Sequence, residues 1–149
     1  MAVDKRGHVW IIQRPRSLAE REAGAQQNPP WSKCCYAAPP VMQFDQAGNL
    51  LRAWGGSGAG YEWPEVEHGI FIDDNDFVWT AGSGSKDSQI LKFTLDGKFV
   101  LQIGKSGQSN GSNDTANLGS PADINVDAAA KEDYRSEEHT SELQSLAYL

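Results

Sequence analysis

The side chain best suited to chemistry in this sequence is the imidazole of His68. Imidazole can ligate a metal ion, and a histidine near a turn can also serve as a hydrogen-bonded structural residue. His68 stands directly before Gly69 and an apolar run that ends at Asp73. Both roles remain open for His68, which we take as the candidate metal ligand of the chain.

Two adjacent cysteines, Cys34 and Cys35, are the second feature with chemical potential. They could form a vicinal disulfide, pair with a partner elsewhere, or remain free thiols. Structural zinc sites use spaced pairs such as C-x-x-C, so this pair does not predict one. Two cysteines in one loop favour a secreted protein, and we expect an extracellular or periplasmic location.

An acidic run at residues 73–76 invites a calcium interpretation. Phe77 stands where a calcium-binding loop needs an oxygen ligand, and the run contains no glycine for its sharp turn. Aspartate and asparagine are favoured in tight turns for their own hydrogen bonds. The run therefore predicts a structural turn.

Three aromatic residues fall in expected loops, where an exposed ring favours recognition of a partner. These residues are Trp31, Tyr61 and Trp63, and we predict that they form the binding surface. Trp31 belongs to a proline-bearing insertion at residues 14–40, in which residues 16–25 could form a short helical turn or two.

Two sequence units recur along the chain and must position these side chains. Residues 41–55 align without gaps with residues 90–104. Residues 3–10 match residues 72–79, and a third copy of that unit begins at residues 124–127. Self-similarity at this scale indicates a repeat architecture.

Each unit has the pattern of a β-hairpin. Residues 90–95 alternate between apolar and polar side chains, Asp96-Gly97 supplies a turn, and residues 99–103 form the return strand. Two hairpins in series make a four-stranded sheet, and such sheets repeated along a chain form the blades of a β-propeller.

The sequence therefore predicts an all-β fold, a partial β-propeller of about two and a half four-stranded blades over residues 1–130. A propeller is favoured over a sandwich because loops 55–64 and 104–121 each lead to a new copy of the same hairpin pair. The recurring tryptophans Trp10, Trp54 and Trp79 are expected to pack between blades.

The second blade resembles the NHL repeat. Its matching residues are Pro64, His68-Gly-Ile-Phe-Ile-Asp73, Val78-Trp79, Ile90-Leu-Lys-Phe93, Asp96-Gly97 and Gly104. The resemblance covers about residues 1–130. It departs from the repeat pattern at the glycine-free turn 73–76 and at the insertion 14–40.

The resemblance implies a propeller that has six blades when complete, so further blades are expected as partners of this segment. NHL propellers include the peptidyl-hydroxyglycine amidating lyases, in which histidines in a context like that of His68 hold zinc. Two functions follow as expectations. One is a binding scaffold for a protein or small-molecule ligand; the alternative is a metal-dependent lyase or hydrolase with zinc or calcium in the central channel.

Residues 135–149 resemble an in-frame translation of a short-read sequencing adapter. We therefore expect residues 131–149 to be a non-native tail, either helical or disordered, because the third repeat breaks off soon after Asp127.

The charge pattern argues against two classes of partner. The formal net charge is −7 and no basic cluster occurs, which disfavours nucleic-acid binding because phosphate contacts need lysine and arginine. No apolar run approaches the length of a transmembrane helix, so no membrane span is predicted.

Overall fold

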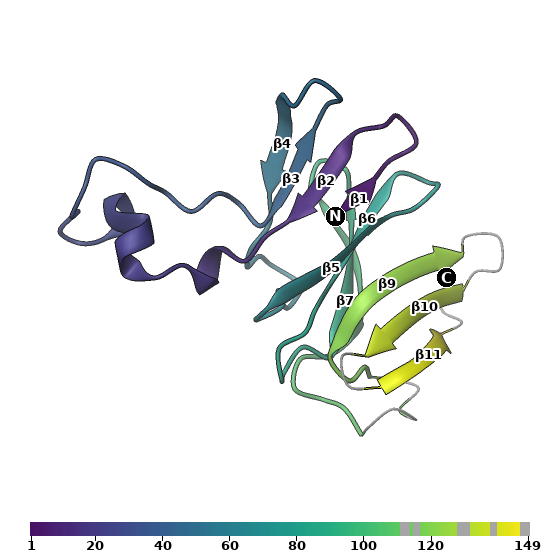
Figure 1. The fold of residues 1–149 in the computed structure, drawn as a ribbon. Coiled ribbons are helices and arrows are strands. Elements are labelled where there is room, and N and C mark those ends of the chain that lie inside the picture. Colours follow the sequence, from purple (N-terminus) through teal and green to yellow (C-terminus); the bar gives the residue numbers. More distant parts are fainter. Residues whose placement is uncertain (111–113, 115–116, 128–131, 138–139, 147–149) are drawn as a thin grey trace.

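The computed structural model describes residues 1–110, 114, 117–127, 132–137 and 140–146. These residues form three antiparallel sheets, two of four strands and one of three, shown side by side in Figure 1. In both four-stranded sheets the strands follow sequence order. The prediction of an all-β chain built from four-stranded hairpin pairs is confirmed at this level, and the described residues form no closed ring.

The first two sheets correspond to the two sequence repeats. The strands of the first sheet are β1 (Ala2–Val3), β2 (Val9–Ile12), β3 (Val41–Phe44) and β4 (Leu50–Trp54). Those of the second sheet are β5 (Glu67–Ile72), β6 (Phe77–Gly82), β7 (Gln89–Thr94) and β8 (Phe99–Gly104).

The third sheet corrects the prediction for the tail. Its strands are β9 (Pro121–Asp127), β10 (Glu132–Glu137) and β11 (Thr140–Leu146), with β10 between the other two. The expectation of a helical or disordered tail at 131–149 is wrong for the described residues, which pair as strands. The physical reason is the edge of β9, whose backbone N–H and C=O groups need partners that β10 supplies. The resemblance of residues 135–149 to an adapter stays a prediction.

The first hairpin of the second sheet is organised by one buried carboxylate. Asp73 Oδ1 accepts hydrogen bonds from the backbone N–H groups of Asn75 and Phe77, both at 2.9 Å. Asp73 Oδ2 accepts a third from Trp79 Nε1 at 2.8 Å. The same side chain therefore closes the β5–β6 turn and orients the indole that β6 buries.

The first sheet repeats this arrangement at Asp4. Its Oδ1 accepts from the backbone N–H groups of Arg6 and His8 at 2.9 and 3.0 Å, and its Oδ2 accepts from Trp10 Nε1 at 3.1 Å. Burial by itself would raise the pKa of Asp4, but these hydrogen bonds and the nearby His8 outweigh it and lower the pKa to about 2.

Both faces of the second sheet are buried. One face packs against the first sheet, with Val78, Leu91 and Phe93 in the shared core, and the other packs against β9, with Trp79 and Ile90 in a second core. Adjacent residues Val78 and Trp79 point to opposite faces, as the two-residue period of a strand requires. The predicted packing role of the recurring tryptophans is confirmed.

The outer hairpin of the second sheet sits close to the first sheet. Gly97 has φ +82°, as its predicted turn requires, and a Cβ added there would lie 2.7 Å from the indole of Trp54. Trp54 Nε1 also donates a hydrogen bond to the carbonyl of Leu95 at 3.1 Å. Glycine at this turn therefore permits both the backbone conformation and the close approach of neighbouring sheets.

We expect Asp73→Asn to lower the free energy of unfolding of the full chain by about 1–3 kcal/mol, because an amide nitrogen cannot accept the buried N–H bonds that one carboxylate oxygen accepts. Urea denaturation followed by tryptophan fluorescence measures the change. Asp74→Asn is the matched control, since Asp74 lies exposed in the same turn and should change stability by less than about 0.5 kcal/mol. Equal losses in the two variants would contradict the role assigned to Asp73.

The lowered pKa of Asp4 predicts a specific loss of stability in acid. Because the folded-state pKa lies below the value of 3.8 that applies without these contacts, the stabilisation is present above about pH 4 and is lost as the pH falls towards about 2. Unfolding free energies measured across this range should fall more steeply for wild type than for Asp4→Asn. Identical slopes for the two proteins would rule out this contribution.

Candidate functional site

The insertion at residues 14–40 projects away from the three sheets (Figure 1). It contains two 3-10 helices, η1 (Pro15–Ser17) and η2 (Glu20–Gln26), which confirm the predicted short helical turns. The prolines and the absence of apolar alternation keep the remainder of this segment out of the neighbouring sheet.

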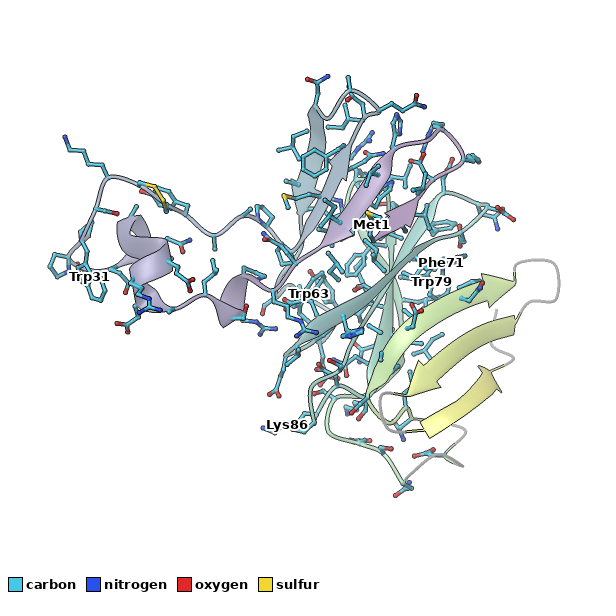
Figure 2. All side chains as sticks on the ribbon, viewed as in Figure 1. Met1, Trp31, Trp63, Phe71, Trp79 and Lys86 are labelled. Carbon is cyan, nitrogen blue, oxygen red and sulfur yellow. A yellow bond between two sulfur atoms is a disulfide. The ribbon has the colours of Figure 1, made fainter. Side chains whose placement is uncertain are left out.

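Two aromatic side chains are exposed on the insertion. Trp31 has an exposed fraction of 60 % and Tyr36 one of 72 %, and Figure 2 shows Trp31 at the end of the insertion far from the sheets. The backbone N–H of Trp31 donates to the carbonyl of Gly24 at 3.0 Å, which ties this part of the loop to η2. The predicted exposure of Trp31 is confirmed. Sequence reasoning missed Tyr36, although it lies in the same proline-rich loop.

Between these two aromatics, Cys34 and Cys35 form a disulfide with each other. This selects the vicinal pairing from the three alternatives that the sequence left open. The carbonyl of Cys34 accepts hydrogen bonds from the backbone N–H of Ala25 at 3.1 Å and from Ser32 Oγ at 2.5 Å. The hydrogen bond from Ala25 therefore ties the disulfide segment to η2.

Tyr61 and Trp63 are not exposed loop aromatics, which corrects the premise on which they were predicted to bind. Trp63 is 8 % exposed and belongs to the core between the first two sheets, and Tyr61 packs beside it. The Tyr61 ring lies 5.1 Å from that of Phe93 and 5.0 Å from that of Phe99, measured between centroids. The loop between β4 and β5 folds back into the junction of the sheets, so its aromatic rings fill the core.

A cavity of about 300 Å³ lies where the insertion meets this loop. Its walls come from both ends of the insertion and the last residue of η2, from the loop between β4 and β5 and from the start of β5. The lining residues are Pro15, Arg16, Gln26, Ala37, Ala38, Pro39, Pro40, Gly55, Gly56, Ser57, Trp63 and Glu67. Of the predicted binding residues, Trp63 alone lines this cavity.

The polar centre of the cavity wall is Glu67, the first residue of β5, which is 2 % exposed. Its Oε1 accepts a hydrogen bond from Trp63 Nε1 at 2.7 Å and lies 3.6 Å from Nη2 of Arg16. Sequence reasoning missed Glu67. The available signal was a charged residue directly before His68, at the start of an otherwise apolar strand.

His68 follows Glu67 in β5 and bonds across to the third sheet. Its Nδ1 lies 2.6 Å from the carbonyl oxygen of Ala122 in β9. Because a carbonyl oxygen only accepts, the Nδ1–H of His68 is the donor in this bond. Ala122 occupies in the third repeat the position that His68 occupies in the second, so the bond joins equivalent points of adjacent sheets.

Within the described part of the chain, no group of three or more histidine, cysteine, aspartate or glutamate side chains is placed to hold a metal ion. A zinc or calcium centre that uses His68 would have to take its other ligands from elsewhere. The enzymatic alternative therefore stays a prediction.

The acidic turn at residues 73–76 has the structural role that its sequence predicted. Both carboxylate oxygens of Asp73 accept N–H groups, and Lys92 Nζ lies 3.9 Å from Oδ2. The Lys92 ammonium also lies 4.3 Å from the ring centroid of Phe77 and 4.4 Å from that of Trp79. These donors and this cation already satisfy the carboxylate.

Among the described residues, no helix is both long enough and apolar enough to cross a membrane.

Comparison with known proteins adds no relative: no protein-family model matches the chain, and no curated protein matches it. The likeness to the NHL repeat therefore depends on the residues of the chain itself.

The geometry of His68 predicts a structural contribution that can be separated from metal binding. We expect His68→Ala to lower the unfolding free energy by about 1 kcal/mol, because the Ala122 carbonyl loses its donor. His68→Gln, whose amide can donate in its place, should recover part of this loss. Thermal denaturation with and without added zinc measures both roles. A zinc-dependent rise in Tm that His68→Ala abolishes would contradict a purely structural role and support the metal interpretation.

Proposed function

We propose that this chain is part of an NHL-type β-propeller that acts as a binding scaffold, with recognition carried by the insertion at residues 14–40. The observation that carries this proposal is the exposure of Trp31 and Tyr36 on a segment that projects from packed sheets. Large amphipathic rings bury much area at little conformational cost, which is why binding surfaces favour them.

The propeller assignment is supported by two repeated features, the four-stranded antiparallel sheet and the Asp–Trp hairpin in each, and by burial of both faces of the second sheet. Closed propellers contain about four to eight blades, so this proposal requires further blades as partners, six in all for an NHL ring. Loop insertions in such arrays gather on one face and serve recognition.

The insertion is well suited to hold its aromatics in place. The disulfide of Cys34 and Cys35 lies between Trp31 and Tyr36, and backbone hydrogen bonds join this loop to η2. A loop restrained in this way loses less entropy when a partner binds.

The disulfide also supports an extracellular or periplasmic location, where the environment keeps cysteines oxidised. The net charge of −7 argues against nucleic acid as the partner. A protein or a small molecule fits the exposed aromatic rings, and a peptide is the most direct probe of them.

We expect peptides selected from a random display library against the immobilised full chain to depend on Trp31. Trp31→Ala should weaken their binding by about tenfold or more, as truncation of a central aromatic contact does, and Tyr36→Ala should also weaken it. Fluorescence polarisation of labelled peptides measures the affinities.

Leu51→Ala provides the matched control, since Leu51 is an exposed apolar residue of β4, 44 % exposed, away from the insertion. Its peptide affinities should equal those of wild type. Selected peptides that bind Trp31→Ala as tightly as wild type, or a selection that enriches none, would count against a binding surface on the insertion.

A further inference from the structure

The cavity at the base of the insertion is lined by Glu67, one of whose carboxylate oxygens has no hydrogen-bond partner in the described part of the chain. Among the described residues, Oε2 of Glu67 is the one buried side-chain oxygen or nitrogen that has no hydrogen-bond partner. Buried polar atoms are nearly always paired, because leaving one without a partner loses its interaction with water. An unpaired carboxylate oxygen at a cavity wall points to a ligand that supplies the donor.

The protein holds the other oxygen of this carboxylate firmly. Glu67 Oε1 accepts from Trp63 Nε1 at 2.7 Å, and Trp63 is itself 8 % exposed and packed in the core. The carboxylate is therefore fixed in one orientation at the start of β5. A fixed acceptor of this kind binds a donor group without an ordering cost of its own.

The charge partner that the protein supplies is held less firmly. Nη2 of Arg16 lies 3.6 Å from Oε1 of Glu67, outside ordinary hydrogen-bond range, and the Arg16 side chain is 51 % exposed. Its guanidinium instead donates to the carbonyl of Pro64. The Arg16 guanidinium is thus held near Oε1 of the carboxylate by charge attraction and without a hydrogen bond to it, which leaves this partner open to replacement by another cation.

The two arginines beside Glu67 do not turn the cavity into an anion site. Nε of Arg14 donates to the backbone carbonyl of Glu67 at 2.7 Å, as Arg16 donates to that of Pro64. Glu65, the other nearby acid, is exposed and lies 3.8 Å from Lys86 through its Oε1. The atom of the cavity wall that lacks a partner is Oε2 of Glu67, which needs a hydrogen-bond donor. A charged donor bonds a carboxylate more strongly than a neutral donor does.

The remaining walls select what the donor is attached to. Prolines 39 and 40, alanines 37 and 38, and the indole of Trp63 make most of the lining apolar. Gln13 Nε2 donates to the carbonyls of Ala38 and Pro39 at 2.7 and 3.1 Å, which fixes this wall to the end of β2. The volume of about 300 Å³ is at the lower end of the range for small-molecule pockets.

We propose that this cavity binds a small organic cation of the amidinium or guanidinium class, which carries an apolar substituent and takes the place of the Arg16 guanidinium on the carboxylate of Glu67. The planar cation donates to Oε2, and its substituent lies against the prolines and Trp63. This site is separate from the Trp31 and Tyr36 surface proposed above and does not depend on it.

The test is isothermal titration calorimetry of the full chain with benzamidine, and with two probes of similar shape, neutral benzamide and anionic benzoate. Benzamidine should bind saturably with one site per chain, at least tenfold more tightly than benzamide or benzoate. Glu67→Gln, which removes the charge but keeps the shape, should weaken benzamidine binding at least tenfold. Glu65→Gln, a nearby exposed acid, is the matched control and should leave the affinity within about twofold.

The variant Arg16→Ala tests whether the Arg16 guanidinium competes with the ligand for Glu67 or instead helps to form the binding site. If Arg16 competes for the carboxylate, its removal should tighten benzamidine binding several-fold. Should Glu67→Gln fail to fold, Ala37→Phe narrows the cavity while it leaves the carboxylate intact, and it should weaken binding to a similar degree.

Four results would overturn the proposal: no saturable binding of benzamidine, equal binding of benzamide, unchanged affinity in Glu67→Gln, or weaker binding in Arg16→Ala. Trp31→Ala should leave benzamidine affinity unchanged. Loss of peptide binding and loss of benzamidine binding therefore report on different surfaces, and either proposal can fail alone.

Discussion

A buried hydrogen bond from a tryptophan indole to an aspartate six residues earlier organises each four-stranded sheet. At Asp4 and at Asp73 the same carboxylate also accepts two backbone N–H groups of the following turn. Turn geometry and side-chain direction are thereby coupled. A slip of one residue in the hairpin would break these bonds and send the indole to the opposite face of the sheet.

The stacking of the sheets follows from this fixed register. Because alternate residues of β6 are committed to opposite faces, the second sheet can pack against the first sheet and against β9 at the same time. The loop between β4 and β5 then fills the first junction with Tyr61 and Trp63. Trp63 in turn orients Glu67 through the hydrogen bond from its indole. The geometry of the candidate cation site therefore depends on how the first two sheets pack together.

The insertion at residues 14–40 carries two different kinds of surface. Its far end presents Trp31 and Tyr36 to solvent, beside a disulfide, and its base closes over a buried carboxylate through Arg16. The first suits an extended apolar contact and the second suits a single charged group. Both depend on the sheets beneath, because the segment has little core of its own: of its residues only Ala23, Gly24 and Pro40 are buried.

The local structure of the two repeats follows from the sequence: period-two alternation predicts the strands, Asp96-Gly97 predicts a turn, and the recurrence of Trp10 and Trp79 predicts buried faces. These signals are local, since each depends on residues within one hairpin. The sequence did not predict that Tyr61 and Trp63 are core residues, that Glu67 lines a cavity, or that β10 pairs with β9. The first two depend on segments that meet across long sequence separations, whereas β9 and β10 are neighbours along the chain and pair as a hairpin. An aromatic ring in a loop has the same sequence signature whether it faces solvent or a neighbouring sheet, and an open strand edge accepts any backbone that reaches it.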